Sequence, residues 1–161
     1  MSNDDILEQA RTFEKNLLNF FERLGVSYHE GEDLLQETYL RLWKYRDQYK
    51  PTAKLSTFLF TIARQVRIDA LRRRTRRERR EDIWMKESPS RIAYHGPLRE
   101  DVRWAISKLP DTLRETIELA VFQELPYADI AQILDIPVGT VKSRVSNALK
   151  KLKEIFDDKG S

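Results

Sequence analysis

The chain is a succession of stretches in which apolar residues recur every three or four positions, which is the spacing of amphipathic helices. The first stretch covers residues 6–24, and we expect its helix to stop at Gly25. The second covers residues 33–46, where Leu34, Leu42 and Tyr45 share one stripe. Acidic residues at its start and basic residues at its end suit the dipole of a helix.

A third helix is predicted after the loop 49–55, because Pro51 interrupts the pattern and restricts the residue before it. Ser56 or Thr57 is the expected N-cap, and the helix continues to about residue 80. The periodicity then fades over residues 82–97, which we interpret as a linker. Extended, it would span about 50 Å, more than one turn of B-DNA at about 34 Å.

The second half of the chain predicts two short helices, at residues 98–109 and 112–122, followed by a helix pair. The pair covers residues 125–153, and its turn contains Pro137, which suits the first position of a helix. The second helix carries an apolar face, and Gly139, Lys142, Ser143, Ser146 and Lys150 lie on the other side. This arrangement resembles a helix-turn-helix, whose second helix enters the major groove. The alternative is an ordinary helical hairpin with a solvated basic face.

These elements predict an all-α fold of two small helical domains, residues 1–81 and 98–158, joined by the short linker 82–97. The 161 residues suffice for two modest cores.

Charge is strongly segregated along the chain. Residues 41–80 contain 14 Lys/Arg and 3 Asp/Glu, a net charge of +11, and residues 1–40 contain 3 and 9, a net charge of −6. Seven arginines fall between Arg72 and Arg80, where like charges would repel on a solvated helix. Phosphates are the expected neighbour, with a lipid surface as the competing anion. Phe58 and Phe60 either stack on exposed bases or pack in the core.

Several function classes are not expected. There is no cysteine, and no apolar run approaches the length of a membrane span. The start of the chain does not resemble a signal peptide, so we expect a cytoplasmic protein without membrane insertion. His29-Glu30 and Glu32-Asp33 do not converge on one helix face, and no catalytic constellation is visible. We therefore expect no metal, no cofactor and no enzymatic activity, which argues against a recombinase or nuclease.

Three motifs resemble those of a known family, the extracytoplasmic-function class of bacterial sigma factors. They are DLLQETYLRLW at residues 33–43, STFLFTIARQVRIDALRRR at residues 56–74, and the stretch from SKLPDTLRETIE to VSNALKKLK at residues 107–153. The resemblance covers roughly residues 10–80 and 99–156. It implies a polymerase subunit that recognises the −35 and −10 promoter elements and assists strand opening.

The resemblance also implies site residues and partners. The β′ clamp helices of core RNA polymerase would contact Asp33, Gln36, Glu37 and Arg41, and the β flap of the polymerase is a further implied partner. The −10 element would be recognised and opened by Tyr49, Lys54, Ser56, Phe58, Phe60, Arg64, Gln65, Arg67, Arg72, Arg73, Arg76 and Arg77. The −35 element would be bound by Thr140, Lys142, Ser143, Arg144, Ser146 and Lys150. An anti-sigma factor is an expected further partner.

Three positions depart from the family pattern: Phe58 replaces the usual Trp, Gln65 the usual Asn, and Asp135 the usual Gly of the turn. Asp135 is expected to need left-handed geometry, which Asp tolerates better than most residues. The alternative function is a helix-turn-helix regulator that is not a polymerase subunit. That reading leaves the motif at residues 33–43 and the arginine run without a role.

Overall fold

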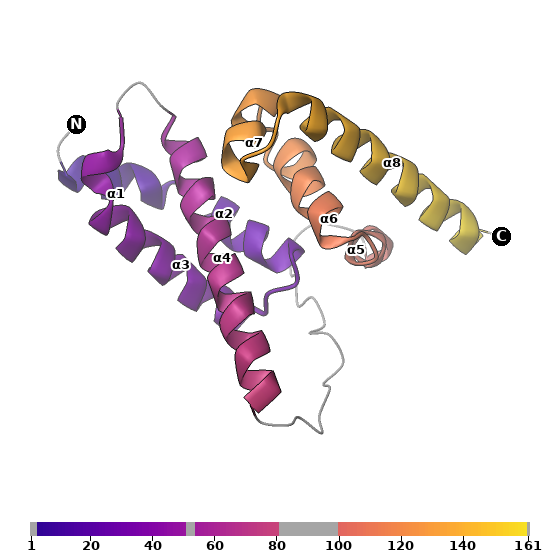
Figure 1. Cartoon of the computed structure of the whole chain (residues 1–161), viewed down its shortest axis with the longest axis horizontal. Coiled ribbons are helices and arrows are strands. Elements are labelled where there is room, and N and C mark those ends of the chain that lie inside the picture. The colour runs from indigo at the N-terminus through magenta and orange to yellow at the C-terminus, as the bar shows by residue number, and fades with distance from the viewer. Residues whose placement is uncertain (1–2, 51–53, 81–99, 161) are drawn as a thin grey trace.

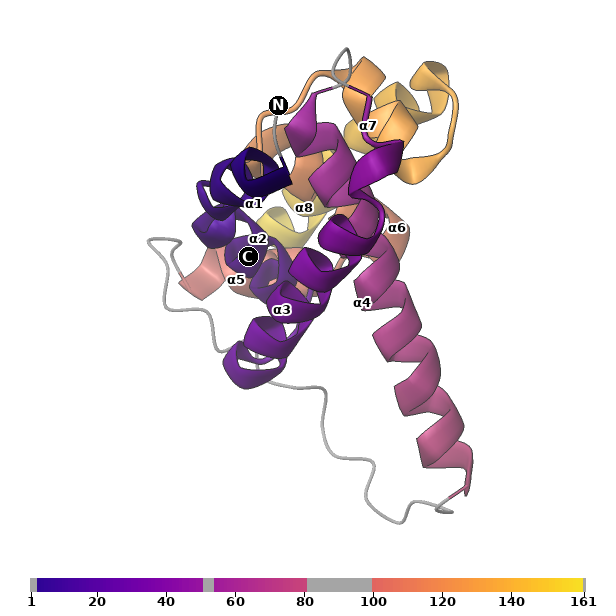
Figure 2. The ribbon, with the colours of Figure 1, turned by 90° about the vertical axis from the view of Figure 1, so that its left-hand side faces the viewer.

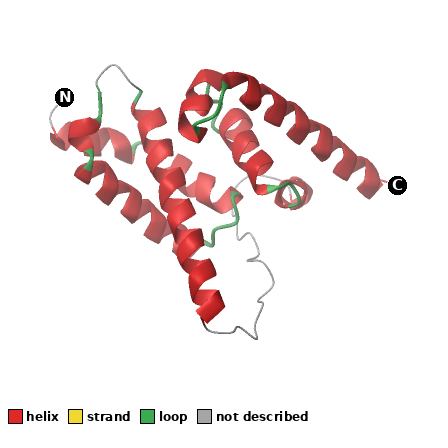
Figure 3. Ribbon diagram, in the orientation of Figure 1, coloured by secondary structure: helices red, strands yellow, loops and turns green. Residues whose placement is uncertain are grey.

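The computed structural model describes residues 3–50, 54–80 and 100–160, and every regular element within these ranges is helical (Figure 3). The predicted all-α fold of two helical domains is confirmed, and the two domains lie side by side (Figure 1). The predicted linker 82–97 falls outside the described residues. Among the described helices, none combines the length and the apolar character that spanning a membrane requires.

The first domain begins with two helices where the sequence predicted one. α1 (Asn3–Arg11) and α2 (Glu14–Arg23) are separated at Thr12 and Phe13, although the apolar stripe runs through both. The hydroxyl of Thr12 donates to the carbonyl of Gln9 at 2.6 Å, and such local bonds compete with the helical ladder. The prediction of one continuous helix over residues 6–24 is therefore wrong.

Gly25 ends α2 as predicted, with φ at +92°. Its N–H donates to the carbonyl of Glu22 at 3.0 Å, and the N–H of Val26 donates to the carbonyl of Phe21 at 3.0 Å. These two bonds are those of a Schellman motif, which satisfies the last carbonyls of the helix.

α3 (Tyr28–Lys44) begins five residues before the predicted stretch, because Ser27 caps it by accepting the N–H of Glu30 at 3.3 Å. A short 3₁₀ turn, η1 (Arg46–Gln48), follows. Tyr45, which the pattern placed on the apolar stripe, lies just beyond α3 and is exposed, whereas Leu34 and Leu42 are buried.

α4 (Leu55–Arg80) starts one residue before the predicted N-cap Ser56. It packs along α3, and its buried face ends at Arg67. Residues 71–80 are exposed throughout, and this C-terminal part projects away from the other helices (Figure 2). The first domain's core is formed by large apolar side chains of α2, α3 and α4, namely Leu17, Phe20, Phe21, Leu42, Leu59 and Phe60.

The second domain contains α5 (Glu100–Ser107), α6 (Asp111–Ile117), α7 (Tyr127–Leu134) and α8 (Val138–Gly160). The helix predicted over 112–122 changes at Glu118 into a π-helical turn, η2 (Glu118–Phe122), in which the N–H of Gln123 donates to the carbonyl of Glu118 at 3.0 Å. A wider turn changes which residues face inward. Val121, an apolar residue of η2, is consequently 46% exposed.

The helix pair α7 and α8 has the predicted turn. Asp135 adopts φ 55° and ψ 51°, and the N–H of Ile136 donates to the carbonyl of Ala131 at 3.1 Å. Pro137 lies one residue before α8 rather than inside it, and its carbonyl accepts the N–H groups of Thr140 and Val141. α8 is longer than predicted, and its residue Leu149 is 51% exposed.

The two domains also pack against each other. α7 lies against α4, and α5 contacts α2 (Figures 1 and 2). Most of the buried apolar residues of the two domains form one continuous cluster. The sequence predicted two domains joined by a linker but not this docking.

The left-handed conformation of Asp135 predicts a stability order. Asp135→Gly should be at least as stable as the wild type, because glycine adopts positive φ without a Cβ penalty. Asp135→Val should lose about 1–2 kcal/mol, because a β-branched residue is strained there. Urea unfolding followed by circular dichroism measures both free energies. Equal stability of the valine variant and the wild type would contradict this conformation.

Candidate nucleic-acid and polymerase interfaces

The helix-turn-helix presents one free polar face. Val141, Val145 and Ala148 anchor α8 in the core of the second domain. The residues predicted for the −35 element lie on the opposite side. Lys142, Ser143, Ser146 and Lys150 are exposed, and Thr140 and Arg144 are partly exposed. A Cβ added at Gly139 would meet nothing within 4 Å, so the entry to the helix is open. This face has the shape and charge that suit a major groove.

A second basic surface follows α4. Arg72, Arg73, Arg76 and Arg77 all point to solvent on its projecting part. Within the same run Arg74 pairs with Glu78 at 3.2 Å, both side chains being about half exposed. Such a pair contributes little to stability. The run is therefore a largely uncompensated cationic surface, which suits a polyanion.

An aromatic pair lies at the N-terminal end of α4. The rings of Tyr49 and Phe58 stack with centroids 5.4 Å apart and an interplanar angle of 23°, and both are partly exposed. Ser56 is partly exposed beside them, and Lys54 is exposed. A partly exposed aromatic stack next to a basic residue is suited to contact an unstacked base.

Phe60 does not belong to this surface. It is 1% exposed, and its ring packs edge-on against Phe20 with centroids 5.4 Å apart. Of the two possibilities that the sequence left open for Phe60, the structure shows core packing. The expectation that Phe60 stacks on bases does not fit this position, because a base would have to displace the core.

The predicted polymerase face lies on α3. Asp33 and Gln36 are exposed, whereas Glu37 and Arg41 are linked at 3.0 Å. Arg41 also pairs with Asp69 of α4 at 2.8 Å, and Gln65 donates to the same carboxylate at 2.9 Å. The hydrogen bond from Arg41 lowers the pKa of Asp69, against the effect of burial. This network fixes α3 on α4 and orders the face.

The same face contains two residues that the sequence analysis did not single out. Leu40 is 66% exposed, and Trp43 is 38% exposed beneath the guanidinium of Arg46, 4.0 Å from the ring centroid. Leu40 lies one helical turn after Gln36, on the polar side of α3. The sequence contains one signal for this contact surface, which is that Leu40 lies outside the apolar stripe. A large exposed apolar residue beside polar ones is typical of contact surfaces.

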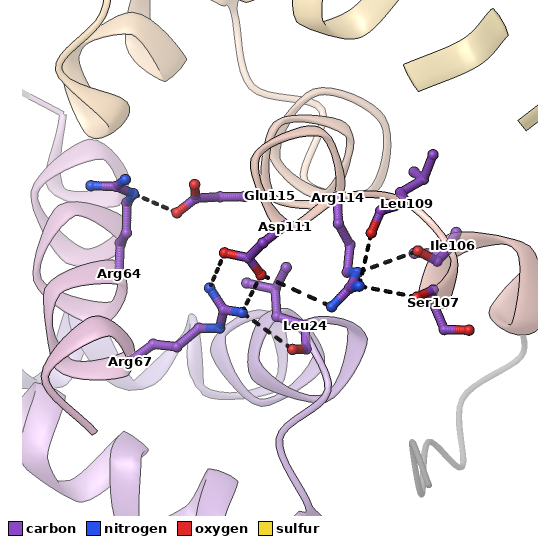
Figure 4. Close-up of polar contacts among 9 residues, drawn as sticks. All are labelled: Leu24, Arg64, Arg67, Ile106, Ser107, Leu109, Asp111, Arg114 and Glu115. Carbon is purple, nitrogen blue, oxygen red and sulfur yellow. Dashed lines mark hydrogen bonds and ion pairs between the residues drawn. The ribbon is translucent and has the colours of Figure 1, made fainter. Parts of the chain in front are cut away.

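Three of the residues predicted for the −10 element contact the second domain, and Figure 4 shows two of them, Arg64 and Arg67. Arg67, only 4% exposed, forms two bonds to Asp111, at 2.6 and 3.4 Å, and a third to the carbonyl of Leu24 at 3.4 Å. Asp111 lies on α6, and Arg64 pairs with Glu115 of that helix. Lys54 pairs with Asp129 of α7 at 2.9 Å.

A fourth pair, Arg23 with Glu118, is buried, at 2.6 Å. Burial raises the pKa of Glu118, an effect that Arg23 and a hydrogen bond from Gln123 partly offset. Two hydrogen bonds join Gln123 to Asn16 of α2. The side-chain amide of Asn16 donates to the side-chain oxygen of Gln123 at 3.1 Å, and the side-chain amide of Gln123 donates to the backbone carbonyl of Asn16 at 3.2 Å. We call these four ion pairs, which join the two domains within the described part of the chain, the interdomain seam.

Asp111 is held in its ionised form within the seam. Burial alone would raise its pKa, but the hydrogen bond from Arg67 and the charges of Arg67, Arg114 and Arg64 outweigh burial and lower it. Arg114 itself is anchored by three carbonyls, those of Ile106, Ser107 and Leu109 (Figure 4). The α5–α6 turn therefore presents Asp111 to Arg67 in a fixed position.

Comparison with known proteins identifies this arrangement. Residues 10–77 match the family model of sigma-70 region 2, and residues 99–152 match that of sigma-70 region 4. The ECF RNA polymerase sigma factor RpoE of Cereibacter sphaeroides is 31% identical, covering 91% of this chain and 83% of its own. EcfG of Rhodopseudomonas palustris is 34% identical, covering 95% and 83%.

Solved structures give the same result. The sigma factor RpoE of Bartonella quintana, in complex with the anti-sigma factor NepR, has a TM-score of 0.81 and 29% identity, covering 95% of this chain and 97% of that one. CnrH, solved with the cytosolic domain of CnrY, shares the fold with a TM-score of 0.73 and 19% identity. The chain belongs to the ECF family of RNA polymerase sigma factors, and the alternative of an unrelated helix-turn-helix regulator is not favoured.

The different positions of the two phenylalanines predict different effects on stability. Phe60→Ala should lower the free energy of unfolding by about 3–5 kcal/mol, as truncation of a buried phenylalanine does. Phe58→Ala should lose clearly less, because its ring is partly exposed. Chemical denaturation of both variants provides the measurement. Equal losses would contradict the assignment of Phe60 to the core and Phe58 to the surface.

Proposed function

We propose that this sigma factor divides its tasks between four surfaces. The α3 face binds core RNA polymerase, and the projecting part of α4 follows promoter phosphates. The Tyr49–Phe58 stack receives an unstacked base of the −10 element, and α8 binds the −35 element in the major groove. The observation that carries the proposal is that one chain offers the exposed α3 face and the free α8 face on different domains.

Polymerase binding is assigned to α3 because its outward side combines exposed polar groups with Leu40, while Arg41 and Glu37 are engaged in holding α3 on α4. An apolar residue surrounded by polar ones is the usual composition of a contact surface. In this proposal Asp33, Gln36 and Leu40 make the contact, and Glu37 and Arg41 position it.

DNA binding is assigned by charge and exposure. Salt-dependent contacts to phosphates suit the arginines of α4, and base-edge contacts suit Lys142 and Ser143 of α8. Because the relevant partners are polymerase and chromosomal DNA, the proposed site of action is the cytoplasm. We also propose control by an anti-sigma factor, which is supported by the likeness to the Bartonella quintana protein in complex with one.

Leu40 offers a test of the polymerase face. Leu40→Ala should weaken binding to core polymerase by about tenfold, the effect of removing one central apolar contact. Its helix content should not change, since the side chain is 66% exposed. Leu71→Ala is the matched control, because Leu71 is an exposed leucine on α4 outside this face. Binding is measured by fluorescence titration, and equal affinities of the two variants would remove the assignment.

Lys142 offers a test of the −35 surface. Lys142→Ala should lose about 1–3 kcal/mol on a promoter duplex carrying the matching element and little on a scrambled duplex. Lys151→Ala is the control, because nine residues along a helix place Lys151 on the opposite side of α8. Electrophoretic mobility shifts compare the two variants. A similar loss on both duplexes would mean that Lys142 contacts phosphate and reads no base.

A further inference from the structure

One accessible face of α4 connects the Tyr49–Phe58 stack to the arginine run. Phe58, Thr61, Gln65 and Arg72 are exposed or partly exposed, and their spacing places them on the same side of the helix. Gln65 follows Phe58 by two helical turns, a rise of about 10 Å, which equals about three stacked bases at about 3.4 Å each. A strand that follows α4 from the aromatic stack toward the arginines therefore passes Gln65 within the next few nucleotides.

The side-chain amide of Gln65 is held by Asp69, whose two carboxylate oxygens have different partners. Oδ2 accepts from Nη1 of Arg41 at 2.8 Å, and Oδ1 accepts from Nε2 of Gln65 at 2.9 Å. Arg41 is itself anchored on Glu37, to which its Nε donates at 3.0 Å. Asp69 is thus fixed from α3, and it fixes the amide one helical turn before it on α4.

The orientation of this amide follows from the chemistry of its partner. The hydrogen bond from Arg41 holds the pKa of Asp69 below its ordinary value, so the carboxylate is ionised and can only accept. Turning the amide over would bring the carbonyl oxygen of Gln65 against a carboxylate oxygen with no hydrogen between them. The nitrogen consequently faces Asp69, and the carbonyl oxygen Oε1 is the atom that this exposed side chain offers to DNA.

A fixed amide discriminates between bases, whereas a free one does not. Adenine and cytosine carry an amino group, which donates, at the position where guanine and thymine carry an oxygen, which accepts. A free glutamine amide turns over and pairs with either group. An amide whose oxygen faces outward pairs with the amino group and repels the oxygen. Its second N–H remains able to donate to a ring nitrogen, as in the two-bond contact of glutamine with adenine.

We infer that Gln65 selects adenine or cytosine over guanine or thymine at one position of the −10 element, and that Asp69 is the positioning residue that imposes this choice. The inference rests on the proposed contact of α4 with the −10 element and adds the class of base that is preferred. Arg41 contributes only through Asp69.

Asp69→Asn tests the positioning role, because the new side chain has nearly the same shape and offers an N–H₂ group in place of one oxygen. If Arg41 keeps the remaining oxygen, that N–H₂ group faces Gln65 and turns its amide over. The preference of the wild type, about tenfold, should fall below about twofold or reverse toward guanine and thymine. A loss of fold would instead lower transcription from every template.

A second exchange should restore the preference. Asp69→Asn combined with Gln65→Glu has the net charge of the wild type, and its carboxylate at position 65 can only accept, whichever way it turns. This double variant should again favour adenine or cytosine, although the carboxylate that paired with Arg41 is gone. Gln65→Met removes the amide at an exposed position and leaves the pair of Asp69 and Arg41 intact, so it should fold and lose the preference.

The measurement is run-off transcription by core polymerase with each protein. The template is a promoter identified by start-site mapping, in which each base of the −10 element is replaced in turn by the other three. Asp157→Asn removes an exposed carboxylate at the far end of α8 and is the charge-matched control, which should keep the wild-type preference. Replacing the preferred base, on one strand at a time, by its analogue without the amino group should reproduce the loss on one strand.

The outcomes separate this inference from the proposed function. Loss of the preference in Asp69→Asn and its return in the double variant would support the inference. A wild-type preference that persists in Gln65→Met would overturn it while leaving the sigma function intact, and this variant decides the matter if Asp69→Asn does not fold. If no template gives a transcript that depends on the added protein, the proposed function fails and the inference fails with it.

Discussion

The pairing of arginines from the first domain with carboxylates of the second organises the whole molecule. A guanidinium removed from water needs a partner, and Arg67 finds it in Asp111 across the domain boundary. Arg114 fixes the turn that carries Asp111, and the buried pair of Arg23 and Glu118 holds η2 against α2. The relative position of the two domains follows from these few charged contacts and from the apolar cluster they share.

α4 links these features because it serves a different purpose along each part of its length. Its first turns bury Leu59 and Phe60 in the core, its middle contributes Arg64 and Arg67 to the seam, and its last ten residues are exposed. Because α4 is a single helix of 26 residues, its packing in the core also fixes where the seam arginines and the exposed arginine run lie. Stability, interdomain contact and the proposed DNA contact are not independent properties of this protein.

Local signals in the sequence predicted much of this architecture. Gly25 and Asp135 mark helix ends because left-handed geometry is needed there, and the basic face of α8 follows from its spacing. The break at Thr12 was not predictable from periodicity, because the apolar stripe continues through it. The exposure of Leu40 also has a local signal, because a leucine lies there on the polar side of a helix.

Features that depend on distant partners could not be predicted. Arg64 and Glu115 lie 51 positions apart, and Arg67 and Asp111 lie 44 apart, so nothing local indicates their pairing. An arginine beside a DNA-binding surface has the same local pattern whether it contacts phosphate or carboxylate. Likewise, the sequence could not decide whether Phe60 belongs to the core, because an apolar residue near a basic run is compatible with both environments.

The central claim is that this chain acts as the promoter-specificity subunit of an RNA polymerase, and transcription start mapping tests it most directly. Purified protein is added to purified core polymerase on fragmented genomic DNA, and the 5′ ends of the transcripts are sequenced. The account predicts new start sites that share two upstream elements and that are absent with core alone. A set of 5′ ends identical with and without the protein would contradict it.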